Sequence, residues 1–293
     1  MTGRLVHTGQ VVVDLVLRID RMPPRGGDVL ASDFLQTPGG GFNVMAAARR
    51  AGADVVYAGS HGRGAYGDLI RDALQREQIH VAHPVTEPDS GISVALVESD
   101  GERTFVTSPG AEGRFTPVGT SANDLVYVSG YSLTHQHNAD ALLEWLPTTE
   151  ATVLLDPGPL VAGISTEIWR AVLANVDILS SSVTEAGHLS EADVATVIRR
   201  EGPNGCTVIH NGRSTHVPGF VVQAVDTNGA GDAHCGVLAA ELLRGNDILT
   251  AAVRANAAAA IAVTRRGPAT APTRAEVDDL VQTRTQPNWN SGL

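Results

Sequence analysis

The sequence predicts an α/β fold: a three-layer sandwich with a central, mostly parallel sheet, helices on both faces and a small β lid. The chain has 293 residues, of which 43% are hydrophobic, so it is long enough to bury a sizeable core. Short apolar strands alternate with helical segments through most of its length. Two β-rich stretches interrupt this alternation, at about 15–37 and 90–108, and they predict lid segments inserted into a single domain that spans residues 1–293.

The N-terminal third contains the first strand–helix–strand units. The opening "RLVHTGQVVVDLVLRI" predicts a long pair of strands. A helix follows in "NVMAAARRAGA" and ends at Gly52, a residue suited to terminate a helix. The strand "DVVYAGS", the helix "YGDLIRDALQREQ" and the strand "IHVAHPV" continue the pattern. In "SGISVALVESDGERTFVTSP", two β-rich runs flank "SDGE", which predicts a hairpin in the lid.

The second half resumes the alternation. Strands are predicted in "DLVYVSG", "ATVLLDPGP", "DILSSS" and "CTVIHNG", and helices in "HNADALLEWL" and "TEIWRAVLANV". The segment "HVPGFVVQAV" predicts a further strand that ends at Val225. Two final helices, "GDAHCGVLAAELLRG" and "DILTAAVRANAAAAIAVT", follow. The second is apolar on all sides, which is typical of a buried helix.

Charge and composition exclude several classes of function. The net charge is −11 and there is no basic tract, so nucleic acid is not the expected partner. No apolar run reaches the ~20 residues that span a bilayer, so no membrane association is expected. The chain has two cysteines and no signal-peptide pattern, which predicts a cytoplasmic protein. All 21 basic residues are arginines, and a P-loop, which needs its lysine, is therefore excluded.

The stretch "AVDTNGAGDAHCGVLAAELLRG", residues 224–245, is the most informative in the chain. It places Gly229, Gly231 and Asp232 at the start of a helix, where backbone N–H groups are unpaired and the helix dipole is positive. Glycines allow an anion to approach those N–H groups closely. Asp232 would repel a bound phosphate unless it has a chemical task, and accepting a proton from an attacking hydroxyl is that task. The simpler alternative is an ordinary capping aspartate after a glycine turn.

Two motifs together resemble the ribokinase-like (PfkB) carbohydrate kinase family. One is "VPGFVVQAVDTNGAGDAHCGVLAAELL", followed by "NAAAAIAVTRRG", and the other is the glycine turn "TPGGGFNVMAAARRAGA". The resemblance covers essentially the whole chain. It implies a ribokinase-like fold and an enzyme that phosphorylates a hydroxymethyl group of a sugar or nucleoside with ATP and Mg²⁺.

The resemblance also implies roles for individual residues. Asp232 matches the catalytic base, and Asp14 matches an aspartate that binds sugar hydroxyls. The anion hole is matched by Gly229, Ala230 and Gly231, and the sugar-binding turn by Gly39, Gly40, Gly41 and Asn43. Asn256 falls where the family contacts adenine. A K⁺ or other monovalent cation site would involve Asp226, Asn228, Ala262, Arg265 and Gly267.

Several of these assignments have structural alternatives. Asp14 follows an apolar run at what looks like a strand end, and an aspartate there with no nearby arginine favours a ligand-facing position. Asn43 could instead be the N-cap of the next helix. Asn256 lies in a buried helix and needs a polar partner, either adenine or neighbouring backbone.

The nucleotide side departs from the family pattern. The usual Asn-x-x-Glu is "SVTE", with Ser182 in place of Asn, while Glu185 is kept and is expected to bind Mg²⁺ through water. The loop Thr-x-Gly-x-x-Gly is assigned to "HNGRST", in which only Gly212 survives. On the sugar side, Val12 and Tyr131 replace residues that ribokinases use to bind ribose, so a ribose substrate does not follow.

The sequence leaves three functions open: a kinase of a pentose or hexose, a nucleoside kinase, and a non-catalytic sugar or nucleotide sensor. A phosphosugar acceptor would need a cation near the lid, and Arg103 and Arg114 are the candidates. Exposed edges of the predicted lid also favour a homodimer formed through it.

Overall fold

The computed structural model describes residues 3–189, 191 and 194–285. Its main sheet has nine strands in the order β13-β12-β11-β10-β9-β8-β1-β4-β5. All pairs from β11 to β5 are parallel, and the hairpin β11-β12-β13 is antiparallel. The strands are β1 (Arg4–His7), β4 (Asp54–Tyr57), β5 (His80–Val81), β8 (Leu125–Ser129), β9 (Thr152–Asp156), β10 (Ile178–Ser182), β11 (Thr196–Arg200), β12 (Gly205–His210) and β13 (Arg213–Pro218).

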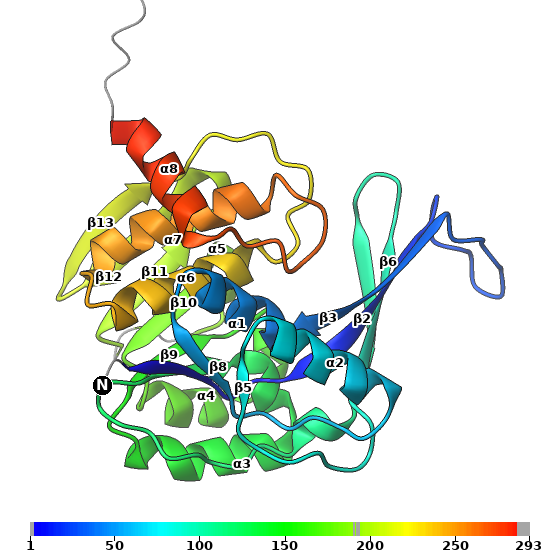
Figure 1. The fold of residues 1–293 in the computed structure, drawn as a ribbon, viewed down its shortest axis with the longest axis horizontal. Helices are drawn as coiled ribbons and strands as arrows, with labels where there is room; N and C mark the ends of the chain where they lie inside the picture. Colours follow the sequence, from blue (N-terminus) through cyan, green and yellow to red (C-terminus); the bar gives the residue numbers. More distant parts are fainter. Residues whose placement is uncertain (1–2, 190, 192–193, 286–293) are drawn as a thin grey trace, which may run out of the picture.

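Helices cover both faces of this sheet (Figure 1). One face packs against α1 (Gly41–Arg50), α2 (Ala65–Arg76), α6 (Ala230–Leu243), α7 (Ile248–Ala262) and α8 (Arg274–Thr285), and the other against α3 (Gln136–Trp145) and α4 (Thr166–Leu173). The alternation of side chains along a strand produces these two cores. In β8, Leu125 and Tyr127 face the first core and Val126 and Val128 the second. The short α5 (Val183–Ala186) follows β10, and 3-10 helices span Ala111–Gly113, Gly130–Thr134, Leu146–Thr148, Val161–Gly163 and Gly202–Asn204. The predicted three-layer α/β architecture is confirmed.

The lid is a separate four-stranded sheet in the order β3-β2-β6-β7, projecting to the right in Figure 1. Its strands are β2 (Val11–Arg18), β3 (Asp33–Gly40), β6 (Ile92–Val97) and β7 (Arg103–Ser108). The opening pair of strands is therefore divided between the two sheets, since β1 belongs to the main sheet and β2 to the lid.

Two sequence-based details are wrong. The strand expected to end at Val225 forms only in its first three residues: β13 ends at Pro218, and Val225 is exposed while its N–H donates to the carbonyl of Val263. Asp14 lies in the middle of β2, not at a strand end. In both cases the limits of the strand are set by pairing with neighbouring strands and not by the extent of the apolar run.

The site depends on close packing between α1 and α6. A side chain at Gly236 would place its Cβ 2.3 Å from the carbonyl oxygen of Val44 and 2.6 Å from the Cβ of Ala47. Glycine at this position therefore lets the two helix backbones approach each other. Their N-terminal ends, which carry the two glycine motifs, are held side by side as a result.

Candidate active site

The largest cavity described, about 1000 Å³, lies between the lid and the carboxyl ends of the parallel strands. His7 ends β1, Asp156 ends β9 and Arg200 ends β11, and all three line it. The N-terminal ends of α1 and α6 close it from the side of the first core. Ligands of open α/β sheets bind at this edge, because the loops after parallel strands diverge there.

Each glycine of the predicted sugar-binding turn has a physical reason. A Cβ at Gly39 would lie 2.1 Å from Oδ2 of Asp14, so glycine leaves room for that carboxylate. Gly40 has φ of 59°, in the region that glycine adopts without strain. A Cβ at Gly41 would lie 2.2 Å from the imidazole of His7. The turn thus brings backbone close to two polar side chains of the cavity wall.

Asn43 connects the two predicted motifs. It is the third residue of α1, buried, and not the N-cap, which is Gly40. Its side-chain amide donates a hydrogen bond of 2.9 Å to Oδ2 of Asp232, across 189 residues of sequence. The capping alternative for Asn43 is therefore wrong. The contact stabilises the charged form of the Asp232 carboxylate and orients it.

Gly229, Ala230, Gly231 and Asp232 form the start of α6 and line the cavity. Gly229 has φ of 75°, and a Cβ there would lie 2.0 Å from the carbonyl oxygen of Pro268. Within the described residues, the backbone N–H groups of Gly231 and Asp232 have no acceptor. Burial raises the pKa of Asp232 to about 6, and the hydrogen bond from Asn43 opposes that rise. A base with this pKa beside free amides suits proton abstraction next to a bound anion.

Asp14 faces the same cavity from β2 in the lid. Burial, together with the negative charge of Asp232, raises its pKa to about 7. Two carboxylates therefore converge on one region of the cavity. Both accept hydrogen bonds from hydroxyl groups when ionised, which is the chemistry of a site for a polyhydroxylated molecule.

Two further polar atoms in the cavity wall are buried and unpartnered among the described residues: Nε2 of His7 and Oδ1 of Asn43. Burial lowers the pKa of His7 to about 3, so the ring is neutral. Its Nδ1 accepts from the N–H of Gly9 at 3.1 Å, so Nε2 carries the proton. Sequence analysis did not identify His7, because a histidine inside an apolar strand gives no signal of what it faces.

Glu185 and Ser182 form a capping box at the start of α5. The N–H of Ser182 donates to Oε2 of Glu185 at 2.7 Å, and the N–H of Glu185 donates to Oγ of Ser182 at 3.3 Å. Glu185 lines the cavity, whereas Ser182 does not. The hydroxyl of Ser182 is thus used for capping, while a carboxylate oxygen of Glu185 stays available to a hydrated magnesium ion, which prefers oxygen ligands. Among the described residues no three metal-binding side chains cluster, so water and phosphate would supply the other ligands.

The assignment of the nucleotide loop to "HNGRST" is not supported by the structure. Asn211 and Gly212 are the two turn residues between β12 and β13, with φ of 51° and 71°, and Gly212 does not line the cavity. The loop directly after β11, "REGPNG", instead has glycines at 202 and 205 with φ of 59° and 97°. It matches the spacing Thr-x-Gly-x-x-Gly, with Arg200 in the place of Thr, and Arg200 lines the cavity although Gly202 and Gly205 do not. The missed signal was a Gly-x-x-Gly immediately after a parallel strand.

Asn256 is buried within α7 and does not line the cavity. Its side-chain amide donates to the carbonyls of Val217 at 3.0 Å and Pro218 at 3.4 Å. The partner that its buried position required is therefore the neighbouring backbone. The expected contact with adenine has no support from this geometry.

The residues expected at a monovalent cation site gather in one region, where the oxygens of Asp226 and Ala262 already accept hydrogen bonds. The carboxylate of Asp226 accepts from Arg103 of the lid, from the N–H of Asn228 at 2.9 Å and from the N–H of Gly267 at 3.1 Å. The carbonyl of Ala262 accepts from Thr270 Oγ1 at 3.1 Å and from the N–H of Arg265 at 3.0 Å. Since the guanidinium of Arg103 already neutralises the carboxylate, a second cation would have to displace it.

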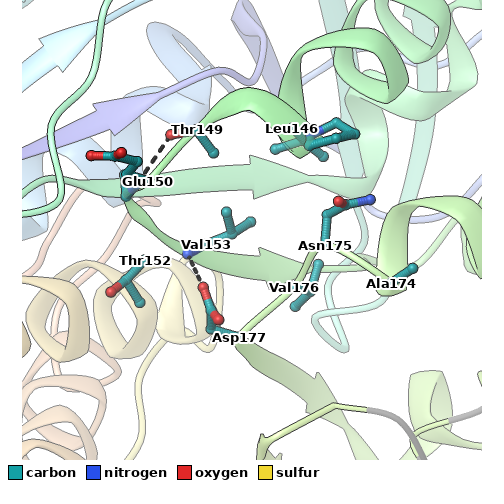
Figure 2. A pocket seen from close by; sticks show the side chains of 11 residues that line it. Leu146, Thr149, Glu150, Thr152, Val153, Ala174, Asn175, Val176 and Asp177 are labelled. Atoms are coloured by element: carbon teal, nitrogen blue, oxygen red, sulfur yellow. Dashed lines mark hydrogen bonds between the residues drawn. The ribbon is translucent and has the colours of Figure 1, made fainter.

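A second, smaller cavity of about 350 Å³ lies at the opposite, amino ends of β9 and β10 (Figure 2). Two of its backbone N–H groups are satisfied locally: that of Val153 donates to Asp177 at 2.8 Å, and that of Ala151 to Oγ1 of Thr149 at 3.2 Å. It carries none of the predicted site residues.

The described residues contain no helix long and apolar enough to cross a membrane.

Comparison with known proteins agrees with the fold and with the two motifs. Residues 3–274 match the pfkB family of carbohydrate kinases. The chain is 30% identical to an uncharacterized sugar kinase, YegV, of Escherichia coli (92% of this chain and 91% of that protein), and 29% identical to the ribokinase of Bacillus subtilis (93% and 97%).

Solved structures share the fold at lower identity. The ribokinase of Giardia lamblia superposes with a TM-score of 0.85 at 21% identity (97% of this chain and 100% of that one). A nucleoside kinase of Burkholderia thailandensis, solved with inosine, superposes with a TM-score of 0.79 at 22% identity (97% of each chain). With the family match over nearly its whole length, this chain belongs to the pfkB family of carbohydrate kinases and is a phosphotransferase that acts on a hydroxyl group.

Proposed function

We propose that the protein transfers the γ-phosphoryl group of ATP to the hydroxymethyl group of a small, neutral sugar, a pentose or hexose, with Asp232 as the general base. One observation carries the proposal: Asp232, held by Asn43, stands in the cavity beside the unpaired N–H groups at the start of α6. A base and an anion-binding site in one helical turn are what transfer from a phosphate to an alcohol requires.

The reaction uses these groups in one step. The acceptor hydroxyl gives its proton to the Asp232 carboxylate as its oxygen attacks the γ-phosphorus, and the bond to the β–γ bridging oxygen breaks to release ADP. The N–H groups of Gly231 and Asp232, at the positive end of the α6 dipole, stabilise the charge on the transferred phosphoryl oxygens. Mg²⁺, held through water by Glu185, would neutralise further phosphate charge.

Charge favours a neutral acceptor. Asp14 and Asp232 both face the acceptor region, while Arg103, the lid cation nearest to the cavity, is already paired with Asp226. A phosphosugar would bring a further anion toward two carboxylates that have no free cation beside them among the described residues, and like charges repel at this range. Arg114 is exposed and does not line the cavity. The donor Nε2 of His7 and the acceptor Oδ1 of Asn43 suit the hydroxyls of a polyol.

The lid supports a homodimer as part of the proposal. Leu35 and Phe105 lie on the lid face that continues from the cavity and are 46% and 52% exposed. A second copy whose lid crosses this face would cover them and would close the cavity. Sedimentation at micromolar concentration tests this, and a monomeric mass would contradict it.

Both cysteines are free and buried, and the cytoplasmic location expected from the sequence stays a prediction.

A panel of acceptors tests the function directly. Purified protein is incubated with Mg²⁺ and ATP and, in separate assays, with neutral pentoses and hexoses, phosphosugars and nucleosides, and ADP release is measured. We expect turnover with a neutral sugar and none with phosphosugars. Turnover with nucleosides alone would make the protein a nucleoside kinase. A ligand-dependent rise in melting temperature without ADP release would favour a sensor and would refute the enzyme.

A further inference from the structure

Arg200 is a buried cation in the wall of the cavity, and the proposed reaction gives it no role. It is the last residue of β11, its side chain is 13% exposed, and it lines the cavity. A burial this deep is rare for arginine unless carboxylates pair with it. Here the partners are Asp156 and Glu185, which line the same cavity.

The guanidinium is held mainly by Asp156. Nη1 and Nη2 of Arg200 donate to the two oxygens of Asp156 at 2.7 and 3.3 Å, which fixes the plane of the group. Glu185 accepts a single hydrogen bond, from Nη2 at 3.1 Å, with the oxygen that also accepts from Ser182. The contact with Glu185 is therefore the one that an incoming anion can replace while the guanidinium stays in place.

The guanidinium also lies beside the anion hole. A Cβ at Gly231 would sit 3.7 Å from both Cζ and Nη1 of Arg200. Glycine at this position keeps the space between the free N–H groups of α6 and the guanidinium clear of any side chain. An anion bound at the start of α6 would thus have a fixed positive charge next to it, in surroundings largely shielded from water.

We propose that Arg200 binds the β- and γ-phosphates of the nucleotide, replacing its hydrogen bond to Glu185 with one to a phosphate oxygen. Asp156 is then a positioning residue for the guanidinium. The inference rests on the proposed function and deepens it: arginine stands where the family pattern has threonine, so a charged fork takes the place of a hydroxyl in the wall of the cavity. In a chain without lysine, it is a cation whose guanidinium lies within 4 Å of where a Cβ of Gly231 would stand, next to the anion hole.

Calorimetry with nucleotides that differ only in phosphate number tests the proposal. ATP, ADP and AMP are titrated into the wild type, Arg200→Thr and the control Arg199→Thr, each with Mg²⁺ and with EDTA. Arg199 pairs with Glu191 and does not line the cavity. In Arg200→Thr we expect the Kd of ATP and ADP to rise about 10- to 100-fold, the effect of a lost hydrogen bond to a charged group. The Kd of AMP should change less than about twofold, because AMP lacks the contacted phosphates.

A second variant allows for loss of folding. Arg200→Thr leaves Asp156 buried and unpaired, so Arg200→Thr/Asp156→Asn removes both charges together and should fold even if the single variant does not. The same dependence on phosphate number is expected in it. An equal loss of affinity for AMP and ATP would indicate a purely structural arginine and overturn the inference, as would unchanged affinity for ATP. If either occurs while the wild type phosphorylates a sugar, the proposed function stands; a wild type that binds no nucleotide would overturn both.

Discussion

The acceptor side and the nucleotide side of this one cavity are built differently. On the acceptor side, Asp14, Asn43 and Asp232 are the residue types that the family pattern expects. Asn43 and Asp232 are joined by a direct hydrogen bond of 2.9 Å. On the nucleotide side, the glycines at 202 and 205 keep the spacing of the family pattern and have positive φ, while Ser182 and Arg200 stand in place of its Asn and Thr.

The difference lies mainly in charge. No cation is paired with Asp14 or Asp232 among the described residues, and the pKa values of both carboxyls are raised. On the nucleotide side, the buried cation Arg200 is accompanied by Asp156 and Glu185. Burial acts to raise the pKa of Asp156, but the charge and hydrogen bonds of Arg200 outweigh it and the pKa is lowered. A cation can replace a hydroxyl in a buried wall only if carboxylates are near to balance it. Residues on the nucleotide side can therefore be exchanged as long as their charges balance one another. On the acceptor side, each carboxylate is needed for itself.

The largest expected effect is on the acceptor side, at the base. Asp232→Asn keeps the size of the side chain and removes its ability to take a proton, so kcat should fall about 10²- to 10⁴-fold. The KM values and the melting temperature should change little. Steady-state assay of ADP release with the best sugar of the panel measures this. Turnover close to that of the wild type would refute the assignment of the base.

Substitutions at two glycines, Gly39 and Gly212, test which of their two turns belongs to the site. In Gly39→Ala, the new Cβ would lie 2.1 Å from Asp14 and displace its carboxylate. The acceptor KM should then rise about tenfold, as for a lost hydrogen bond to a charged group. The matched control is Gly212→Ala, which has φ of 71° and lies in the β12–β13 turn. It should cost about 1–2 kcal/mol of unfolding free energy for a strained backbone, with both KM values unchanged. A rise in the ATP KM of Gly212→Ala would indicate that "HNGRST" is the nucleotide loop, as the sequence predicts.

The pH dependence of the acceptor side gives a smaller effect. Asp232 and Asp14, with pKa values raised to about 6 and about 7, act only when ionised. The kcat/KM for the acceptor should therefore rise with pH over roughly pH 5 to 8 and then level off. Asn43→Ala removes the donor that favours ionised Asp232, so the acid limb should move to higher pH by about one unit. The measurement is a pH–rate profile normalised to each plateau. An unmoved limb would show that Asn43 does not tune the base.

Sequence could predict the acceptor side because its chemistry lies in contiguous motifs. The string "GAGD" places amides and carboxylate in one helical turn, and "GGGFN" places Asn43 in the first turn of α1. The alternation of strands and helices likewise predicted the layers, since burial on two faces depends on local pattern. What it could not give is the contact between Asn43 and Asp232, which only the packing of α1 against α6 at Gly236 creates.

The nucleotide side failed for a physical reason as well. Both "REGPNG" and "HNGRST" are turns that contain glycine, and composition alone does not tell which one lies at the carboxyl end of a parallel strand. Sheet topology decides it: β11 is parallel to β10 and points at the cavity, while β12 runs back antiparallel and carries Gly212 away from it.

The smallest expected effect concerns Asn256, and it tests whether this polar side chain stabilises the fold or binds the nucleotide. Because its amide donates to backbone carbonyls of β13, Asn256→Ala should cost about 1–3 kcal/mol of unfolding free energy, the penalty for a buried hydrogen bond left unmade. The ATP KM should stay within about twofold, since the residue lies outside the cavity. Denaturant unfolding and ADP release together measure both effects. A raised ATP KM at unchanged stability would return Asn256 to the adenine site and would extend the nucleotide side beyond the wall formed by Arg200 and Glu185.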